Sequence, residues 1–287
     1  LWLRPSVAVV TTIEYDHPDI FPTPDAVADA FRRFAARIRP GGTLVTSADD
    51  PGCRELVASL PASGPRVVTF GFTPSADWRI ERVAGWDHFT GPDGRTLRLR
   101  LQVPGSHNRL NAAAALAAAS AAGIDPFRLA TGLEAFDGVG RRFDVRGQAG
   151  GVTVIDDYAH HPTEIRATIA AARERYPAAA IWAVFQPHTY SRTQRLLDDF
   201  AAALALADHV ILTPIYPARE TDTLGVRSED IAARVGPQAT VVRSVEEAGE
   251  QAAAATAGDV VLLLGAGDIW KAGETVLRRL HERTGQP

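Results

Sequence analysis

The residues best suited to chemistry follow directly on a short apolar run at residues 152–155. That run ends in the sequence Asp156-Asp157-Tyr158-Ala159-His160-His161-Pro162. In an open α/β sheet, ligands bind beyond the carboxyl ends of the strands, and this cluster has that position along the chain. Carboxylates can accept hydrogen bonds from ribose hydroxyls, and tyrosine and histidine can orient a polar substrate. We therefore predict a ligand site here, with a capped strand-to-helix loop carrying incidental polar residues as the alternative.

A second polar loop follows the next apolar run, one β/α unit later. Its sequence is Phe185-Gln186-Pro187-His188-Thr189-Tyr190-Ser191-Arg192-Thr193. Sequential parallel strands are usually neighbours, so we expect the two loops to face each other. Near the start of a helix, Arg192 could bind a carboxylate through two parallel hydrogen bonds. The alternative is that Ser191 caps the helix and that Arg192 is solvated.

Three further loops carry weaker signals. They are Tyr216-Pro217-Ala218-Arg219-Glu220, Leu264-Gly265-Ala266-Gly267-Asp268 and Ile13-Glu14-Tyr15-Asp16-His17-Pro18-Asp19. The glycines of the second could let a backbone approach a ligand, although a tight turn is the more common meaning of such a pattern. The acidic and histidine side chains of the third are plausible groups for a hard metal or a phosphate site, with an ordinary polar loop as the alternative.

Two other positions could contact a nucleotide. Asn108 and Asn111 are three residues apart and share one face of a predicted helix, and an asparagine offers both the donor and the acceptor that an adenine edge requires. Simple N-capping by Ser106 or Asn108 is the alternative. Arg141 and Arg142 could bring positive charge to a phosphate or a ribose, although such a pair is usually solvated.

The pattern of apolar residues predicts the elements that position these loops. In the second half of the chain, strands are expected at residues 152–155, 181–185, 210–213, 240–242 and 260–264, alternating with helices at 163–175, 192–207, 228–235, 245–254 and 269–283. This alternation predicts an α/β fold with a doubly wound, mostly parallel sheet. In the first half we expect strands at 7–13, 43–46 and 66–72, small antiparallel strands within 79–103, and helices at 24–38, 51–60, 108–122 and 129–136. Gly138-Val139-Gly140 has the composition of a hinge, so we place a domain boundary near residue 138.

Length and composition exclude several classes of protein. The chain has 287 residues, 46% of them hydrophobic and 22% charged, which suits about two globular domains. A net charge of -4 gives no basic surface for nucleic acid, and no apolar run approaches the ~20 residues of a membrane span. The single Cys53 excludes an internal disulfide and fits a reducing cytoplasm. The chain starts at Leu1 and has no methionine, so we expect it to be a fragment of a longer protein, and nothing in it indicates an oligomeric state.

The motifs occur together and in order, and as a set they resemble the Mur ligase family. The set comprises Asp16-His17-x-Asp19, His107-Asn108-x-x-Asn111, Arg141-Arg142-Phe143 and the two loops that begin at Asp156 and Phe185. The resemblance implies a UDP-sugar domain, a central ATPase domain and a Rossmann-like C-terminal domain. Residues 1–137 would then be the C-terminal part of the central ATP-binding domain, and residues 138–287 would be the C-terminal domain. The chain contains no Gly-x-x-x-x-Gly-Lys-Ser/Thr phosphate loop, which the family would carry upstream of Leu1.

The resemblance also implies roles for individual residues. His17 matches a magnesium ligand, Asn108 and Asn111 match the adenine-binding pair, Arg142 and Asp157 match contacts to the ribose and phosphates, and Tyr158, His160 and Arg192 match the site of the incoming amino acid. His160 and Arg192 are the implied catalytic pair. Three residues depart from the family's pattern: Thr12 replaces an asparagine, Pro18 replaces a leucine or methionine, and Thr189 replaces an arginine found in some members.

The reaction that the resemblance implies forms an amide bond at the expense of ATP, with Mg²⁺, in peptidoglycan synthesis. The carboxylate of UDP-N-acetylmuramate becomes an acyl phosphate, and the amine of L-alanine then displaces the phosphate. We expect this chain alone to be inactive, because it lacks the phosphate loop. The alternatives are a recycling member that attaches a tripeptide to UDP-N-acetylmuramate, and a non-catalytic module that holds a nucleotide or a peptidoglycan precursor. A dinucleotide-binding oxidoreductase is disfavoured, because no Gly-x-Gly-x-x-Gly follows a first strand.

Overall fold

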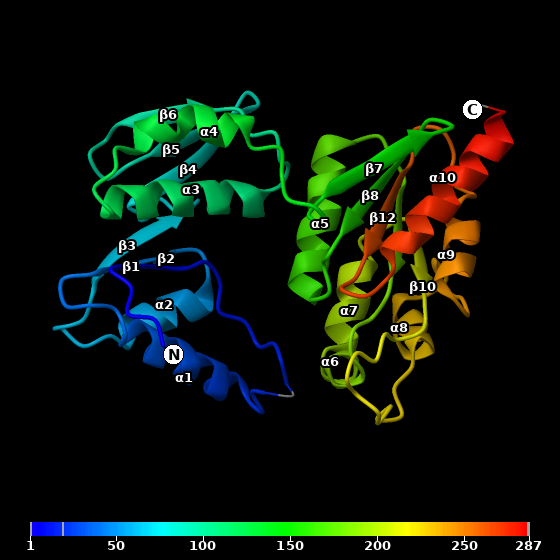
Figure 1. Cartoon of the computed structure of the whole chain (residues 1–287), viewed down its shortest axis with the longest axis horizontal. Coiled ribbons are helices and arrows are strands. Elements are labelled where there is room, and N and C mark those ends of the chain that lie inside the picture. Colours follow the sequence, from blue (N-terminus) through cyan, green and yellow to red (C-terminus); the bar gives the residue numbers. More distant parts are fainter. Residues whose placement is uncertain (1, 19, 286–287) are drawn as a thin grey trace. The chain divides into compact units, whose positions relative to one another are not determined.

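The chain folds into two compact units, Leu1–Asp137 and Gly138–Pro287 (Figure 1). The structure is a computed structural model that describes residues 2–18 and 20–285. The predicted α/β class is confirmed, since each unit contains a six-stranded sheet with helices packed on it. Of the predicted loop motif at residues 13–19, Asp19 lies outside the described residues.

The sheet of the first unit follows the order of the sequence, β1-β2-β3-β4-β5-β6. Its strands are β1 (Val7–Val10), β2 (Thr43–Ser47), β3 (Arg66–Gly71), β4 (Trp78–Val83), β5 (Trp86–Thr90) and β6 (Thr96–Leu99). The first four pair in parallel, and β4, β5 and β6 pair antiparallel, as the alternation within residues 79–103 predicts. β1 ends at Val10, earlier than the predicted end at residue 13, so the chain that leads to His17 is a longer loop than expected.

Helices cover both faces of this first sheet. They are α1 (Pro24–Ala35), α2 (Pro51–Ala58), α3 (Ser106–Ala121) and α4 (Ala130–Ala135), with a 3₁₀ turn η1 (Pro126–Leu129) before α4. On one face, α1 and α2 pack around Leu44 and Leu56. On the other, the alanines of α3 pack against Phe70 and Phe89, and their small side chains allow a close approach to the strands. Figure 1 shows α3 and the pair α1 and α2 on opposite sides of β1 and β2.

The start of α2 also fixes the loop that follows β1. Asp50 is the N-cap of α2, and its Oδ1 accepts hydrogen bonds from the backbone N–H of Cys53 at 2.7 Å and of Ile13 at 3.2 Å. Such a cap satisfies a donor that the first helical turn leaves without a partner. Because the same oxygen holds Ile13, the cap also ties down the beginning of the loop that carries His17.

The sheet of the second unit has the order β11-β10-β9-β12-β8-β7. Its strands are β7 (Asp144–Ala149), β8 (Val152–Asp157), β9 (Ile181–Phe185), β10 (His209–Leu212), β11 (Ala239–Val241) and β12 (Val260–Leu264). All neighbours are parallel except β7, which pairs antiparallel with β8 at the edge. The sequence did not predict β7, because this edge strand is largely solvent-exposed and lacks a run of apolar residues.

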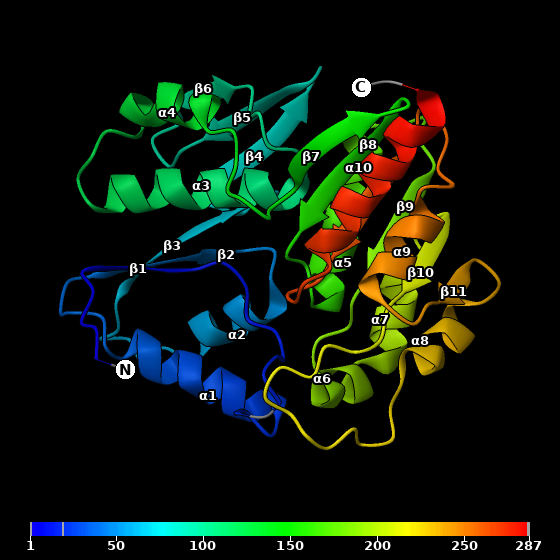
Figure 2. The same ribbon diagram turned by 45° about the vertical axis from the view of Figure 1, so that its right-hand side comes forward.

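Helices cover both faces of the second sheet as well. They are α5 (Pro162–Arg175), α6 (Tyr190–Arg195), α7 (Leu197–Leu204), α8 (Ser228–Val235), α9 (Val245–Ala252) and α10 (Trp270–Thr284). The core on one face includes Ile165 of α5, Phe200 of α7 and Ile231 of α8, and the core on the other includes Ala248 of α9 and Val276 of α10. Figure 2 shows α9 and α10 together on one side of the strands. The sheet is therefore doubly wound, as predicted.

Two details of this unit differ from the prediction. β8 and β9 are not neighbours, because β12 lies between them and pairs with both. The helix expected at residues 192–207 begins earlier, at Tyr190, and is broken at Leu196, where φ is -112° and ψ is 25°. The break separates a short helix that carries Arg192 from the helix that packs on the sheet.

In the part of the chain that the structure describes, no helix combines the length and the apolar character needed to cross a membrane.

Cys53 provides a chemical test of the packing under α2. The side chain is fully buried, and burial raises the pKa of its thiol to about 12. Because the thiolate is the reactive form, we expect no reaction with Ellman's reagent at about pH 8 in the native protein and one reactive thiol per chain in urea. Native protein that reacts as fast as the unfolded chain would contradict this buried position.

Candidate ligand site at the ends of β8, β9 and β12

Three loops of the second unit meet at the carboxyl ends of adjacent strands. The backbone N–H of Gly265, after β12, donates to the carbonyl of Asp157 at the end of β8 at 3.2 Å. The N–H of Gln186, after β9, donates to the carbonyl of Leu264 at 3.0 Å. The two polar loops therefore come together as expected, but through β12 rather than by direct pairing of their strands. The helices after β8 and β12 lie on opposite faces, which is the switch point where α/β sheets bind ligands.

A buried ion pair supports the first of these loops. Asp156 is 1% exposed, and its Oδ2 accepts a hydrogen bond from Arg141 Nε at 3.0 Å. Arg141 also donates through Nη2 to the carbonyl of Gly265 at 2.8 Å, so one guanidinium joins the loops after β8 and β12. Burial raises the pKa of Asp156, and the positive charge of Arg141 opposes that rise. The alternative of a solvated arginine pair therefore does not hold at Arg141, whose guanidinium makes structural contacts.

Asp157 is also held by its own fold. It is 7% exposed, and its two carboxylate oxygens accept backbone hydrogen bonds from Phe143 at 2.9 Å and Ala159 at 2.8 Å. Burial raises the pKa of Asp157, while these two N–H donors oppose the rise. The carboxylate thus holds the backbone just before β7 and just after β8. Its contact with the nucleotide stays a prediction.

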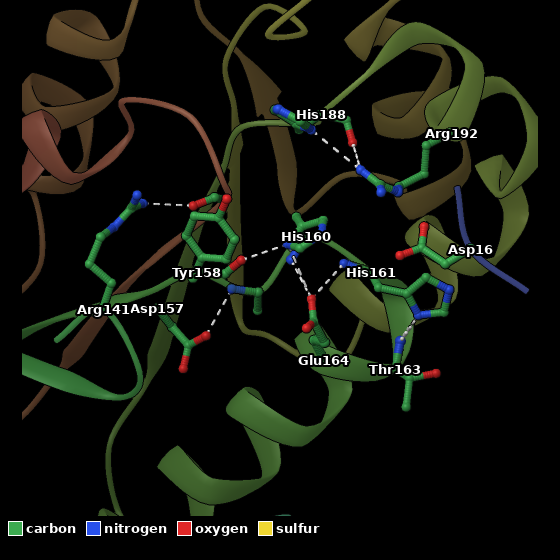
Figure 3. Close-up of polar contacts among 12 residues, drawn as sticks. Asp16, Arg141, Asp157, Tyr158, His160, His161, Thr163, Glu164, His188 and Arg192 are labelled. Atoms are coloured by element: carbon green, nitrogen blue, oxygen red, sulfur yellow. Dashed lines mark hydrogen bonds and ion pairs between the residues drawn. The ribbon is translucent and has the colours of Figure 1, made fainter. Parts of the chain in front are cut away.

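Tyr158 and His160 extend from this support (Figure 3). The backbone N–H of Tyr158 donates to the carbonyl of Arg141 at 2.7 Å. The guanidinium carbons of Arg141 and Arg142 lie 5.0 and 5.5 Å from the centre of the Tyr158 ring, within cation–π range. The rings of Tyr158 and His160 meet edge to face with centroids 5.3 Å apart. Three of the predicted site residues, Arg142, Tyr158 and His160, are therefore brought together.

The partners of His160 define its tautomer. Its Nδ1 lies 2.9 Å from the carbonyl oxygen of Tyr158 and 3.3 Å from Oε2 of Glu164, and both of these atoms are acceptors (Figure 3). Nδ1 must therefore carry a proton, which leaves Nε2 as the basic nitrogen of the neutral ring. Glu164 Oε2 also accepts from the backbone N–H of His160 and His161 at the start of α5, which fixes the carboxylate behind the imidazole. This arrangement suits a ring that accepts a proton at Nε2.

His188 has the opposite tautomer. Arg192, which is 4% exposed, donates through Nη1 to the carbonyl of His188, and the same nitrogen lies 3.3 Å from His188 Nδ1. A guanidinium has no acceptor, so Nδ1 accepts and the proton of the neutral ring is on Nε2. Burial lowers the pKa of His188, and the charges of Arg192 and His160 lower it further. The centroids of the two imidazoles are 6.1 Å apart, so a base and a donor lie side by side.

The loops after β10 and β12 pack behind His188. The Tyr216 ring stacks on the His188 ring with centroids 5.5 Å apart and an angle of 11° between the planes. A Cβ at Gly267 would lie 2.9 Å from the Tyr216 ring and would collide with Oε1 of Gln186. The Gln186 side chain in turn donates to Asp268 at 2.9 Å. The glycine pattern thus serves a close approach, but to neighbouring side chains of the same unit.

The other predicted site residues belong to the first unit. Asn108 and Asn111 lie in the first turns of α3, and Asn108 Nδ2 donates to the carbonyl of Pro104 at 2.7 Å. The N-cap of α3 is Gly105, so neither Ser106 nor Asn108 caps this helix. His17 has a positive φ of 54°, and its Nε2 lies 3.6 Å from Oδ2 of Asp16.

Magnesium was predicted at His17, and the residues present do not by themselves form a site for it. Among residues 2–18 and 20–285, no three histidine, cysteine, aspartate or glutamate side chains come together as a metal ion would require. Mg²⁺ also prefers oxygen ligands in octahedral geometry, and His17 with Asp16 supplies one imidazole and one carboxylate.

Comparison with known proteins assigns the chain to a family. Residues 1–119 match the Mur ligase middle domain, and residues 141–267 match the Mur ligase glutamate ligase domain. The chain belongs to the Mur ligase family. The resemblance drawn from the motifs is therefore confirmed.

Individual relatives indicate which members of the Mur ligase family the chain resembles. The UDP-N-acetylmuramate–L-alanine ligase of Mycolicibacterium vanbaalenii is 42% identical over 98% of this chain and 61% of its own length. That of Kineococcus radiotolerans is 44% identical over 97% of this chain and 61% of its own length. The crystal structure of the Thermotoga maritima UDP-N-acetylmuramate–alanine ligase superposes with a TM-score of 0.72 at 30% identity, over 98% of this chain and 60% of that one. The chain thus spans about three fifths of the length of these relatives.

The sequence does not single out two residues of this candidate site, Glu164 and His188. Glu164 has only the signal of a helix start, since a glutamate three residues after a helix N-cap is a recognisable capping residue. His188 is one of several polar residues in its loop, and the sequence gives it no distinct role. No sequence signal gives its tautomer, because that depends on where the Arg192 side chain folds.

The ion pair of Arg141 with Asp156 can be tested through stability. Because Arg141→Met leaves a buried carboxylate without its partner, we expect it to lower the free energy of unfolding by about 3 kcal/mol. The exposed pair of Arg146 with Asp144 offers a control, and Arg146→Met should cost less than about 1 kcal/mol in the same urea titrations. Equal effects of the two substitutions would contradict the assigned contact.

The pH dependence of the same variant has a definite sign. Burial already raises the pKa of Asp156 in the folded state, and loss of Arg141 removes a contribution that opposes the rise. A carboxyl group whose pKa is higher in the folded than in the unfolded state stabilises less as pH rises from its unfolded value through its folded one. The loss of stability caused by Arg141→Met should therefore shrink as pH falls toward 3.8, the ordinary pKa of an aspartate. The double variant with Asp156→Asn should lose this pH dependence.

Proposed function

We propose that this chain is part of an ATP-dependent ligase that joins L-alanine to the carboxylate of UDP-N-acetylmuramate in peptidoglycan synthesis. The observation that carries the proposal is the pair of imidazoles beside the buried Arg192, in which Nδ1 of His160 faces a carbonyl oxygen and a carboxylate while Nδ1 of His188 faces a guanidinium. An amino acid presents a carboxylate and an amine one carbon apart, and it needs a cation for the first group and a base for the second. The names of the relatives that are more than 40% identical support the same choice.

Arg192 and His188 suit the carboxylate of the amino acid. A guanidinium is a planar cation that can donate two parallel hydrogen bonds to a carboxylate. His188 adds an N–H donor at Nε2, and its lowered pKa keeps the ring neutral, which preserves the Nδ1 acceptor that Arg192 uses. The burial of Arg192 strengthens such an ion pair because water competes less for the charge.

His160 suits the amine. The ammonium group of L-alanine must lose a proton before it can attack the acyl phosphate, and the basic Nε2 of His160 can accept that proton. Glu164 lies behind Nδ1 and stabilises the imidazolium that results, in the way that a carboxylate supports a catalytic histidine elsewhere. The amine nitrogen then forms the bond to the acyl carbon while the bond from that carbon to the phosphate oxygen breaks.

ATP is the proposed phosphoryl donor, and the first step needs groups that the proposed amino-acid site does not provide. The UDP-N-acetylmuramate carboxylate would attack the γ-phosphorus, giving the acyl phosphate and ADP. We assign Asn108 and Asn111 to the adenine and Arg142 and Asp157 to the ribose and phosphates. Residues 1–137 would be the C-terminal part of the ATP-binding domain and residues 138–287 the C-terminal domain. The buried free thiol of Cys53 is consistent with our assignment of the reaction to the cytoplasm.

The proposed function is tested with the full-length protein that contains this chain. Given ATP, Mg²⁺ and UDP-N-acetylmuramate, it should release ADP in a reaction that depends on L-alanine, and L-alanine should outcompete the tripeptide used by the recycling ligase. Preference for the tripeptide would assign the chain to the recycling reaction. ADP release that neither amino compound stimulates would contradict both. The 287-residue chain by itself, which has no phosphate loop, should be inactive in this assay.

The role of His160 predicts a defect in one half of the reaction. Because loss of a general base typically costs about 10²–10⁴-fold in rate, His160→Ala should slow amide formation by a factor in that range. Formation of the acyl phosphate, followed by trapping with hydroxylamine, should stay within about twofold of wild type, because this step needs no base at the amine. His281→Ala, in the last turn of α10, is the matched control. Unchanged amide formation in His160→Ala would exclude the assigned role.

A further inference from the structure

The loop after β10 has no part in the reaction described so far, yet it lies directly against the loop that carries His188 and Arg192. The backbone N–H of Tyr216 donates to the carbonyl of Pro187 at 2.8 Å, next to the stacked rings of Tyr216 and His188. A hydrogen bond of 2.9 Å from the N–H of Glu220 to the carbonyl of Pro217 turns the chain back. The turn brings the Glu220 carboxylate to the residues that follow His188.

Glu220 is held by donors that all come from this neighbouring loop. Its Oε1 accepts from the Thr189 hydroxyl at 2.8 Å and from the Ser191 hydroxyl, and its Oε2 accepts from the Ser191 backbone N–H at 3.0 Å. Partial burial would raise the pKa of Glu220, but these hydrogen bonds lower it overall. The group is therefore a carboxylate at neutral pH, with both oxygens in use.

These contacts replace a cap that α6 does not supply for itself. Thr189 is the N-cap residue of α6, but its side chain makes no capping hydrogen bond and turns to Glu220 instead. The first N–H groups of a helix need acceptors from outside the helix, and a negative charge there is favourable. Glu220 meets both needs by accepting from Ser191. The carboxylate of Glu220, in the loop after β10, thus holds the start of α6, which follows β9.

The residues so fixed lie between the two groups assigned to the amino acid. His188 precedes Thr189, and Arg192 follows Ser191. The guanidinium of Arg192 folds back onto the carbonyl of His188, so the relative position of the two depends on the path of the chain between them. A shift of about 1 Å in a binding group is enough to weaken a substrate contact severely.

We propose that Glu220 is a positioning residue for the amino-acid site, which holds Thr189 and Ser191 so that His188 and Arg192 face the substrate carboxylate together. The proposal deepens the proposed function and rests on it. Glu220 itself needs no contact with the substrate.

The test compares Glu220→Gln with wild type in the full-length protein. The amide is close to the carboxylate in size, but it places an NH₂ group against donors of Ser191 and loses the charge. We expect the KM for L-alanine to rise about tenfold, as loss of one charge-assisted contact would produce, while the KM values for ATP and UDP-N-acetylmuramate stay within about twofold. Glu229→Gln, an exposed glutamate in the first turn of α8, is the matched control and should behave as wild type.

Amide hydrogen exchange provides a readout that needs no catalysis. In Glu220→Gln the amide of Ser191 should exchange about tenfold faster than in wild type, while the amides of β9 stay unchanged. Faster exchange together with the selective rise in KM supports the proposal. Unchanged exchange would show that Glu220 does not hold the loop, and an unchanged KM for L-alanine, or a parallel rise for all three substrates, would also overturn it. A wild-type protein with no L-alanine-dependent ADP release would overturn the proposed function, which the exchange measurement does not involve.

Discussion

The insertion of β12 between β8 and β9 is the constraint on which the candidate site depends. Main-chain hydrogen bonds join the end of β12 to the ends of both neighbouring strands, β8 and β9. The loops after these three strands therefore begin next to one another at the same edge of the sheet. The helices that follow β8 and β9 lie on one face of the sheet, and the helix that follows β12 lies on the other. The chains therefore diverge where β12 ends, and polar side chains can gather there without a helix covering them. Direct pairing of β8 with β9 would send both chains to the same face.

Contacts to buried charges hold this arrangement together. Asp156 and Arg141 neutralise each other, Asp157 accepts two backbone hydrogen bonds, and Arg192 donates to a carbonyl of its own loop. A charge removed from water is tolerated only where such partners are present, and Arg141 and Phe143, which bind Asp156 and Asp157, come from the segment before β7. The contacts that satisfy these carboxylates are therefore also contacts that hold the neighbouring loops together. A side chain that is held in this way can present a donor or a base with little further reorganisation when a substrate arrives.

The sequence predicted the class of the fold and the main loops, because their signals are local. The apolar runs of β8, β9 and β12 and the helical period of α5 appear within a few residues. Strand order is not local, and the rule that sequential strands are neighbours failed at β8 and β9, since the tight pairing of β12 with both depends on the whole sheet. The edge strand β7 and the break at Leu196 also lack a periodic signal. Side-chain roles were the hardest to predict, because Glu220 acts on Thr189 and Ser191, about thirty residues away, which only the folded chain brings within reach.

The two histidines illustrate why residue type alone does not define chemistry. His160 and His188 have the same ring, and their ring centroids lie 6.1 Å apart. The acceptors around Nδ1 of His160 and the guanidinium beside Nδ1 of His188 nevertheless favour opposite tautomers of the two rings. One ring is left with a basic Nε2 and the other with an Nε2–H donor. If their surroundings were alike, the site would have two bases or two donors, and it would suit only one end of the proposed amino-acid substrate. The distinction comes from a carbonyl and a carboxylate on one side and from a folded arginine on the other. The specificity of this site is therefore a property of the loops that hold the rings.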